Sequence, residues 1–243
     1  MGSKNRIADK LLPIILADRK EGQYYIEPFV GGCNMIDKVD GNRIGSDVNE
    51  YLIAMWRGLQ SDYLIRGLFP LNIPKELYAE YRNMYNLHKK RLLNLSNDEK
   101  ALIGWIGFMG SFNGRFFDGG YSGHDVKGRD YIEEQIQNTA LQIPLIKGIK
   151  FMEGSYDQLV YPNNSIIYCD IPYKDTKQYG ICTGFSHDMF FRWVRVMSEY
   201  HTIFISEYEA PNDFEVVTEI ELTNSMSTKN TYKKTEKLFR YYG

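Results

Sequence analysis

Residues Ser165–Tyr173 have the sequence SIIYCDIPY, an apolar, strand-like run that ends abruptly in an acid, a proline and an aromatic residue. We expect a buried strand that delivers Asp170 to the carboxyl edge of a sheet, where open α/β folds bind ligands. Pro172 stiffens the turn, and Tyr173 offers a flat face that suits a planar, hydrogen-bond-donating substrate such as a nucleobase. On this segment alone, a strand followed by an ordinary proline turn explains the pattern equally well.

A second strand-like stretch ends in paired glycines. Residues Tyr24–Cys33 have the sequence YYIEPFVGGC, and glycines at this point let a ligand approach the backbone closely. Asp47 follows Glu27 by 20 residues, at the end of the next predicted strand, where nucleoside-binding α/β folds hold ribose hydroxyls. Separately, these features also fit turn glycines and a solvated acid, so the prediction depends on their combination.

Strand and helix patterns alternate at both ends of the chain but not in the middle, which predicts an α/β fold with a helical insertion. The middle contains a glycine-rich loop, residues 110–123, from which we expect a basic and aromatic tip to project. We expect His187, beside Ser186 and Asp188 at a helix start, on the surface or in the helix cap. The predicted helices cover residues 6–17, 48–60, 74–94, 186–199 and a segment beginning at 97; the predicted strands cover residues 23–29, 43–47, 149–152, 166–170 and 202–206.

Composition sets broad limits. The chain has 243 residues, of which 43% are hydrophobic and 25% charged, enough for one core or one core plus an inserted subdomain. Its formal net charge of −2 does not indicate a polyanion partner, so contact with nucleic acid must rely on local basic surface. Cys33, Cys169 and Cys182 form neither a disulfide framework nor a zinc pattern, and we expect no metal. Without a signal-peptide pattern or an apolar run of about 20 residues, a cytoplasmic location is expected.

The motifs together resemble those of the phage-type DNA adenine (N6) methyltransferases, the D12 class related to the bacterial Dam enzymes. Residues 27–33, EPFVGGC, match the family's cofactor motif E-P-F-x-G-x-G, and residues 170–173, DIPY, match its catalytic motif D-P-P-Y. The N-terminal triplet of residues 2–4, GSK, also matches. Further matching segments lie at residues 128–131, 203–208 and 234–239. The resemblance therefore covers nearly the whole chain, with the motifs in family order.

The resemblance implies a Rossmann-like, S-adenosylmethionine-dependent methyltransferase sheet with an inserted helical target-recognition domain. It divides the chain into a cofactor-binding half (residues 1–60), the target-recognition insertion (61–147) and a catalytic half (148–243). It also implies methyl transfer to the N6 amine of a flipped-out adenine in double-stranded DNA, by a monomer or weak dimer with no metal and no membrane partner. If the chain is phage-encoded, its location is the host-cell cytoplasm.

The implied catalytic residues are Asp170, Ile171, Pro172 and Tyr173. If the Asp170 carboxylate and the Ile171 backbone carbonyl each accept one amine hydrogen, the nitrogen is drawn out of the ring plane and its lone pair can point at the methyl group. Flipping the base costs roughly a few kcal/mol, and stacking on Tyr173 returns about 1–3 kcal/mol.

The resemblance also assigns binding residues. For Ser155 and Tyr156, a loop serine and a packed tyrosine explain the sequence at least as well. For the Lys89–Arg91 run, the residues favour a solvated helix face over a DNA contact. The implied cofactor-binding residues are Lys4, Glu27, Pro28, Phe29, Gly31, Gly32, Cys33, Asp47, Ser155, Tyr156 and Asp170. The implied DNA-binding residues are Lys89, Lys90, Arg91, Asn113, Arg115, Lys127 and Arg129.

Two residues depart from the family pattern. Cys33 stands where the family most often has a glycine, and Ile171 stands where it usually has the first proline of the catalytic motif. The carbonyl of Ile171 can still act as an acceptor, but the turn loses rigidity. Cytosine-N4 methylation, a catalytically weak DNA-binding homologue, and an RNA or protein amine acceptor remain as alternatives.

Overall fold

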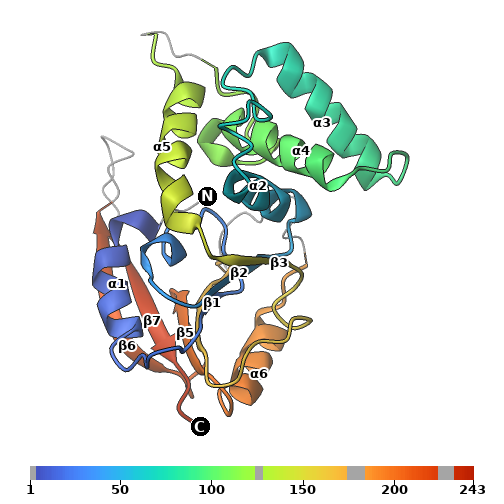
Figure 1. Cartoon of the computed structure of the whole chain (residues 1–243). Helices are drawn as coiled ribbons and strands as arrows, with labels where there is room; N and C mark the ends of the chain where they lie inside the picture. Colours follow the sequence, from blue (N-terminus) through green and yellow to red (C-terminus); the bar gives the residue numbers. More distant parts are fainter. Residues whose placement is uncertain (1–3, 124–127, 174–183, 224–232) are drawn as a thin grey trace.

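The computed structural model describes residues 4–123, 128–173, 184–223 and 233–243. Its centre is a seven-stranded sheet with the strand order β3-β2-β1-β4-β5-β7-β6 (Figure 1). The strands are β1 (Tyr25–Glu27), β2 (Arg43–Asp47), β3 (Lys150–Glu153), β4 (Ile166–Asp170), β5 (Thr202–Glu207), β6 (Glu215–Thr223) and β7 (Lys233–Arg240).

Helices surround the sheet and make up most of the segment between β2 and β3. The α-helices are α1 (Ala8–Ile15), α2 (Glu50–Gln60), α3 (Lys75–Lys89), α4 (Asn97–Met109), α5 (Tyr131–Ile146) and α6 (His187–Met197). Three short 3-10 helices are η1 (Lys4–Arg6), η2 (Ile36–Lys38) and η3 (Phe112–Gly114). The predicted helix and strand positions are largely confirmed: several helices and β1 have shorter ends, β2 and β4 have the predicted bounds, and α5 and β6 are additional.

Five neighbouring strands of the sheet are parallel. Strand β1 pairs with β2 on one side and β4 on the other, β2 pairs with β3, and β4 pairs with β5. Strand β7 is antiparallel to both β5 and β6. The order of the parallel strands reverses between β1 and β4, and open α/β sheets bind ligands beyond the carboxyl ends of the strands at such a switch point. The predicted α/β class with a Rossmann-like sheet is therefore confirmed.

Successive residues of the central strands face two different hydrophobic clusters, because side chains alternate along a strand. In β4, Ile166 and Tyr168 face the cluster that contains the buried side of α1. Ile167 and Cys169 face a second cluster that contains the buried side of α6. The two helices therefore cover opposite faces of the sheet (Figure 1). Burial on both faces explains why β4 is almost continuously apolar in sequence.

Strand β6 has only a weak signal in the sequence, because apolar and charged residues are mixed along EVVTEIELT. It forms at the edge of the sheet, where it pairs with β7 from Glu215↔Arg240 to Thr223↔Lys233, with an irregularity between Val216 and Thr218. Charged residues and a local irregularity are both common on edge strands, where they oppose pairing with other chains.

Side-chain caps fix several helix starts. Ser96 accepts a hydrogen bond from the backbone of Glu99, whose carboxylate accepts one in return, so a capping box with Ser96 as the N-cap precedes α4, which begins at the predicted residue. Asn49 caps α2 and Ser186 caps α6 in the same general way.

Helices α3, α4 and α5 gather above one end of the sheet (Figure 1). Their buried residues belong to the same hydrophobic cluster as those of α1 and α2. Phe69 and Trp105 stack with their ring centroids 4.9 Å apart, and Tyr51 of α2 packs on Phe116 at 5.4 Å. The helical segment is thus continuous with the core of the sheet. Its proposed boundaries, residues 61 and 147, stay a prediction.

The glycine-rich loop differs from its expectation. Phe116 and Phe117 do not project as an aromatic tip, because they are only 7% and 2% exposed. A Cβ atom added at Gly107 would lie 2.7 Å from both rings, so the missing side chain of this α4 glycine makes room for them. The exposed aromatic residue of the loop is Phe112, and the expectation of an aromatic tip at the other two rings is wrong.

Within the described residues, no helix is both long enough and apolar enough to span a membrane.

The contact between α2 and α4 leads to a stability prediction. A Cβ atom added at Gly104 would lie 2.2 Å from the backbone oxygen of Tyr51, which a rotamer change cannot relieve. We expect Gly104→Ala to lower the free energy of unfolding by about 3 kcal/mol, at the upper end of overpacking costs. Gly22→Ala is the control, because nothing lies within 4 Å of its added Cβ atom and only its positive φ adds strain. Urea denaturation of both variants measures the difference; equal losses would contradict steric overlap at Gly104.

Candidate active site

The carboxyl ends of β1, β2 and β4 bring the predicted cofactor and catalytic segments to one edge of the sheet. Ile26 of β1 pairs with Ile44 of β2 and with Ile167 of β4, so the segments that follow these strands leave the sheet side by side. Most of the predicted cofactor and catalytic residues, which are far apart in sequence, lie in or beside these segments.

The loop after β1 has the conformation that a glycine motif provides. Gly31 has a φ of 45°, and Cys33 has a φ of 57° with its side chain fully buried. A left-handed backbone at Cys33 explains why the family prefers glycine at this position, since a side chain there costs roughly 1–2 kcal/mol. The loop is closed by a hydrogen bond in which the Cys33 N–H donates to the Val30 carbonyl at 2.9 Å.

Two helices hold the backbone of this loop. Trp56 Nε1 of α2 donates to the Gly31 carbonyl at 3.0 Å, and Gln142 Nε2 of α5 donates to the Gly32 carbonyl at 3.2 Å. Gln142 also donates to Asp37 Oδ2 at 2.9 Å. The glycine loop is therefore fixed by hydrogen bonds from both α2 and the helical insertion.

Asp47, at the end of β2, is oriented by the same loop. Its Oδ2 accepts from the Gly31 N–H at 3.3 Å, and its Oδ1 accepts from the Asn49 N–H at 3.0 Å. Burial raises the pKa of Asp47 to about 6, while these backbone hydrogen bonds oppose the increase. A carboxylate has about four acceptor positions, so Asp47 retains capacity for further donors such as ribose hydroxyls.

Glu27 lies beneath the loop in a buried position. Its Oε1 accepts a hydrogen bond from the Tyr25 hydroxyl at 2.9 Å, and burial raises its pKa well above the usual value. Glu27 is thus held by a hydrogen bond in a position where the neutral acid is favoured. Pro28 and Phe29 follow directly and lead into the glycine loop.

Aromatic rings lie on the α6 side of the glycine loop. The rings of Phe29 and Tyr156 have centroids 5.5 Å apart, and Tyr156 also packs edge-on against Phe190 and Trp193 of α6. Tyr156 is 8% exposed, so the expectation of a packed tyrosine is confirmed. Ser155 donates a hydrogen bond to Asp157, an acid that the sequence did not single out.

Lys4 is buried against the predicted catalytic acid. Its Nζ lies 3.1 Å from Asp170 Oδ1, forms an ion pair with Glu236 of β7 and donates to the Tyr173 hydroxyl. Burial alone lowers the pKa of Lys4, but the carboxylates of Asp170 and Glu236 outweigh it and raise the pKa above 10.5. Glu236 was not assigned a role from the sequence, although it lies in a segment that carries the family resemblance.

The end of β4 and the residues after it place Asp170 and Tyr173 beside this ammonium. Burial raises the pKa of Asp170, with Lys4 opposing the increase, and the Tyr173 hydroxyl donates to Asp170 Oδ1 at 3.4 Å. Ile171 is 2% exposed and packs in the core cluster with Cys169 and Phe190. Its side chain therefore fills the core, and its backbone carbonyl is the group that can act beside Asp170.

His187 contradicts its expected place on the surface or in the helix cap. Ser186 supplies the side-chain cap of α6, whereas His187 Nε2 lies 2.9 Å from the carbonyl oxygen of Pro172. The side chain of His187 is 17% exposed. No local pattern of residues indicates this contact, because it joins a helix start to a loop 15 residues earlier.

The predicted DNA-binding residues lie in separate places. Lys89, Lys90 and Arg91 lie at the end of α3, in the turn that forms the outer end of the helical part (Figure 1). Lys89 lies over the ring of Tyr85, with Nζ 5.5 Å from its centroid.

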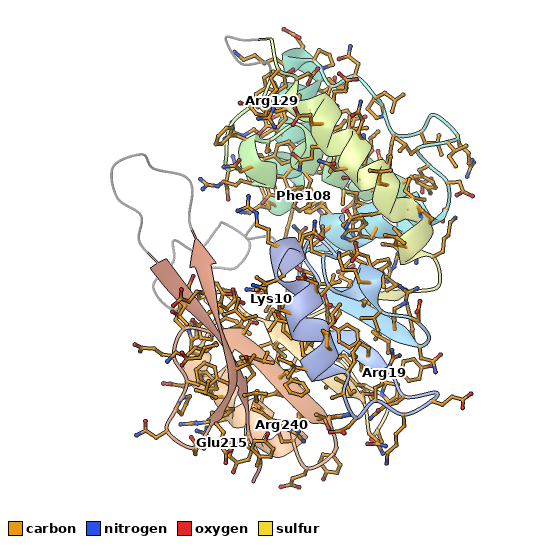
Figure 2. All side chains as sticks on the ribbon, turned by 90° about the vertical axis from the view of Figure 1, so that its left-hand side faces the viewer. Lys10, Arg19, Phe108, Arg129, Glu215 and Arg240 are labelled. Atoms are coloured by element: carbon orange, nitrogen blue, oxygen red, sulfur yellow. The ribbon has the colours of Figure 1, made fainter. Side chains whose placement is uncertain are left out.

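Asn113 and Arg115 are exposed at η3. Arg129 makes a bidentate ion pair with Glu134, with both N···O distances 2.6 Å, at the end of the helical part farther from the sheet (Figure 2). Lys127 lies outside the described residues. The roles of all seven residues stay predictions.

Within the part of the chain that the structure describes, no cluster of three or more histidine, cysteine, aspartate or glutamate side chains is arranged to hold a metal ion.

A glycine loop beside a carboxylate on β2, together with an acid, a proline and an aromatic residue after β4, defines an α/β enzyme of the nucleoside-cofactor-binding class. The model of the D12 class N6 adenine-specific DNA methyltransferases matches residues 1–240, and the chain belongs to this family. The family uses S-adenosylmethionine as methyl donor. No curated protein matched the chain.

One similar solved structure is that of SMU.472, assigned as a methyltransferase and crystallised in complex with SAH. It shares 13% sequence identity with the chain, with a TM-score of 0.42, and the alignment covers 100% of this chain and 53% of the other. The chain thus spans about half the length of that protein.

The raised pKa of Asp47 predicts a pH-dependent contribution to stability. Because the folded state binds the proton more tightly than the unfolded chain, this group makes the protein less stable as the pH rises from about 4 to about 6. The difference in unfolding free energy, wild type minus Asp47→Asn, should fall by about 2 kcal/mol between pH 4.5 and 7.5. Urea titrations across this range measure it. A difference that stays constant with pH would show that Asp47 has an ordinary pKa in the folded protein.

Proposed function

We propose that the protein transfers the methyl group of S-adenosylmethionine to the N6 amine of an adenine flipped out of duplex DNA. The observation that carries this proposal is the group formed by Asp170, Tyr173 and Lys4 at the carboxyl edge of the sheet, beside the glycine loop. A carboxylate and a backbone carbonyl can accept hydrogen bonds from an amine, and an aromatic ring can stack on a planar base.

The residues around the glycine loop fit the proposed cofactor. Asp47 has acceptor capacity for ribose hydroxyls, and the rings of Phe29 and Tyr156 offer an apolar place for an adenine group. A Cβ atom at Gly32 would lie 2.6 Å from the Asn34 side chain, so a larger residue at this position would have to displace Asn34 beside the loop. S-adenosylmethionine supplies an electrophilic methyl group when bound.

The chain's own groups prepare the acceptor. Asp170 and the Ile171 carbonyl each accept one hydrogen of the amine, which frees the nitrogen lone pair from the ring system. The amine releases one proton as the new N–C bond forms. Because burial raises the pKa of Asp170, its carboxylate is suited to hold that proton before water receives it.

Lys4 and the aromatic residues position these groups. The ammonium of Lys4 orients the Asp170 carboxylate, and Glu236 balances its charge. Tyr173 offers one face to the flipped base, and Tyr208 supports it, with the ring centroids 4.6 Å apart. Stacking of this kind offsets part of the cost of taking a base out of the duplex.

DNA contact depends on local basic surface, because the formal net charge is −2. Arg115 and Asn113 are exposed in one tight turn of the helical insertion, and we assign this turn to the DNA interface. The helices of the insertion act as the target-recognition part, and the reaction takes place in the cytoplasm where the DNA is accessible.

The first experiment is mass spectrometry of nucleosides from unmethylated duplex DNA incubated with the protein and S-adenosylmethionine. N6-methyladenine is the expected product. N4-methylcytosine would instead identify the cytosine amine, which the same acceptor groups can activate, as the substrate. If neither appears while calorimetry shows cofactor binding, the proposed activity on DNA is wrong.

The role of Asp170 gives a sharper prediction. Asp170→Ala should reduce kcat by at least about a thousandfold, since the amine loses its charged acceptor, while the Kd for S-adenosylmethionine changes by less than about fivefold. The matched control is Asp18→Ala, which removes an exposed carboxylate elsewhere on the surface. Single-turnover methylation and calorimetry measure the two effects. A comparable turnover rate in Asp170→Ala would refute the catalytic assignment.

The proposed DNA contact predicts a change in salt dependence. If Arg115 contacts a phosphate, Arg115→Ala should reduce the slope of log K against log salt concentration by about 1 and weaken binding of duplex DNA about fivefold to tenfold at low salt. Lys20→Ala is the control. It removes a cation that precedes β1, toward the amino end of this strand, and it should leave the salt slope and the DNA affinity unchanged. Fluorescence anisotropy over a salt series tests this; parallel slopes for wild type and Arg115→Ala would place the residue outside the interface.

A further inference from the structure

We propose that His187 is a positioning residue that holds the Asp170–Tyr173 segment in its reactive conformation; for catalysis, this inference rests on the proposed methyl transfer. His187 is the first residue of α6 and lies 14 residues after Tyr173 in the sequence. Its imidazole nevertheless contacts the backbone of the catalytic segment and a buried carboxylate of β5.

The contacts of His187 join two strand ends. Its Nε2 lies 2.9 Å from the carbonyl oxygen of Pro172 and 3.7 Å from Glu207 Oε2. A carbonyl oxygen can only accept, so Nε2 carries the hydrogen and donates it. The side chain of Glu207 is 3% exposed, and therefore the contact lies in a protected environment where hydrogen bonds are stronger than in water.

Glu207 also links His187 to Tyr173, the residue proposed to stack on the base. Glu207 Oε1 accepts a hydrogen bond from the Tyr208 N–H at 2.7 Å. The ring of Tyr208 in turn packs on Tyr173, with centroids 4.6 Å apart. His187 and Glu207 thus connect the backbone after β4 with the ring that supports Tyr173 from the end of β5.

The position of the held carbonyl explains why the contact matters. The proline ring fixes the φ angle of Pro172, and the hydrogen bond from His187 fixes the carbonyl that follows it. With φ of Pro172 fixed and its carbonyl held, the orientation of the peptide plane between Ile171 and Pro172 is restrained. This plane carries the Ile171 carbonyl, one of the two proposed acceptors of the amine.

Ile171, which replaces the first proline of the family motif, makes a further restraint on the turn important. Ile171 lacks the ring that stiffens the usual D-P-P-Y turn, so the turn needs another restraint. His187 can supply it because its own place is fixed: Ser186 caps α6, and the Phe185 ring packs edge-on against the imidazole at 5.0 Å. A group held on a helix start positions its partner better than one on a free loop.

The test compares His187→Ala with His187→Gln, whose amide N–H can replace the Nε2 donor. We expect His187→Ala to lower kcat about tenfold to hundredfold, as for a small misplacement of reacting groups, with KM for DNA and Kd for S-adenosylmethionine within about threefold of wild type. His187→Gln should recover kcat to within about threefold of wild type. The matched control is His201→Ala. It removes a buried histidine that accepts from Ser165 N–H at the other end of β4 and β5, and it should leave kcat unchanged.

A second measurement is independent of activity. Amide hydrogen exchange of the peptide spanning residues 166–173 should be at least about fivefold faster in His187→Ala than in wild type, and unchanged in His201→Ala. If the wild type makes no methylated nucleoside, the proposed function fails while this measurement still decides whether His187 restrains the segment. Wild-type kcat and exchange in His187→Ala would overturn the inference. Equal loss of kcat in the Gln and Ala variants would also overturn it, because the hydrogen-bond donor would then not be the cause.

Discussion

The site depends on one buried ammonium group, Nζ of Lys4. It joins the N-terminal segment to Asp170 after β4 and to Glu236 of β7, three parts of the chain that are far apart in sequence. A buried charge is tolerated only when it is paired, so each of the three groups requires the other two. The carboxylates raise the pKa of Lys4 against the effect of burial, and Lys4 partly offsets the effect of burial on Asp170. The segment that carries Lys4 is consequently part of the candidate active site.

The helical insertion is coupled to the cofactor region through packing and hydrogen bonds. Its core is continuous with that of α1 and α2, and Gln142 of α5 donates to the carbonyl of Gly32 in the glycine loop. A helix that contacts the target would therefore also contact the backbone that is proposed to bind the methyl donor. The arrangement provides a physical link between the two binding events, because displacement of α5 changes the loop directly.

The two departures from the family motifs have different physical consequences. Cys33 keeps the left-handed backbone of a glycine at φ 57°, so the change adds local strain but leaves the loop in place. Ile171 is buried in the core, where its side chain packs with Cys169 and Phe190. The departure at Cys33 therefore affects the conformational energy of the glycine loop. The second concerns the rigidity of the turn after β4, and in our proposal the contact of His187 with Pro172 compensates for the missing proline ring.

The sequence by itself determined the α/β class, the alternation of strand and helix patterns, the glycine loop and the acid at the end of β4. All of these follow from local periodicity and short motifs. Tertiary structure alone decided which distant groups meet. It buried Lys4 between Asp170 and Glu236, turned Phe116 and Phe117 into the core and placed His187 on Pro172. None of these contacts has a fixed spacing in the chain. They arise from pairing and packing between segments, which a pattern of neighbouring residues does not encode.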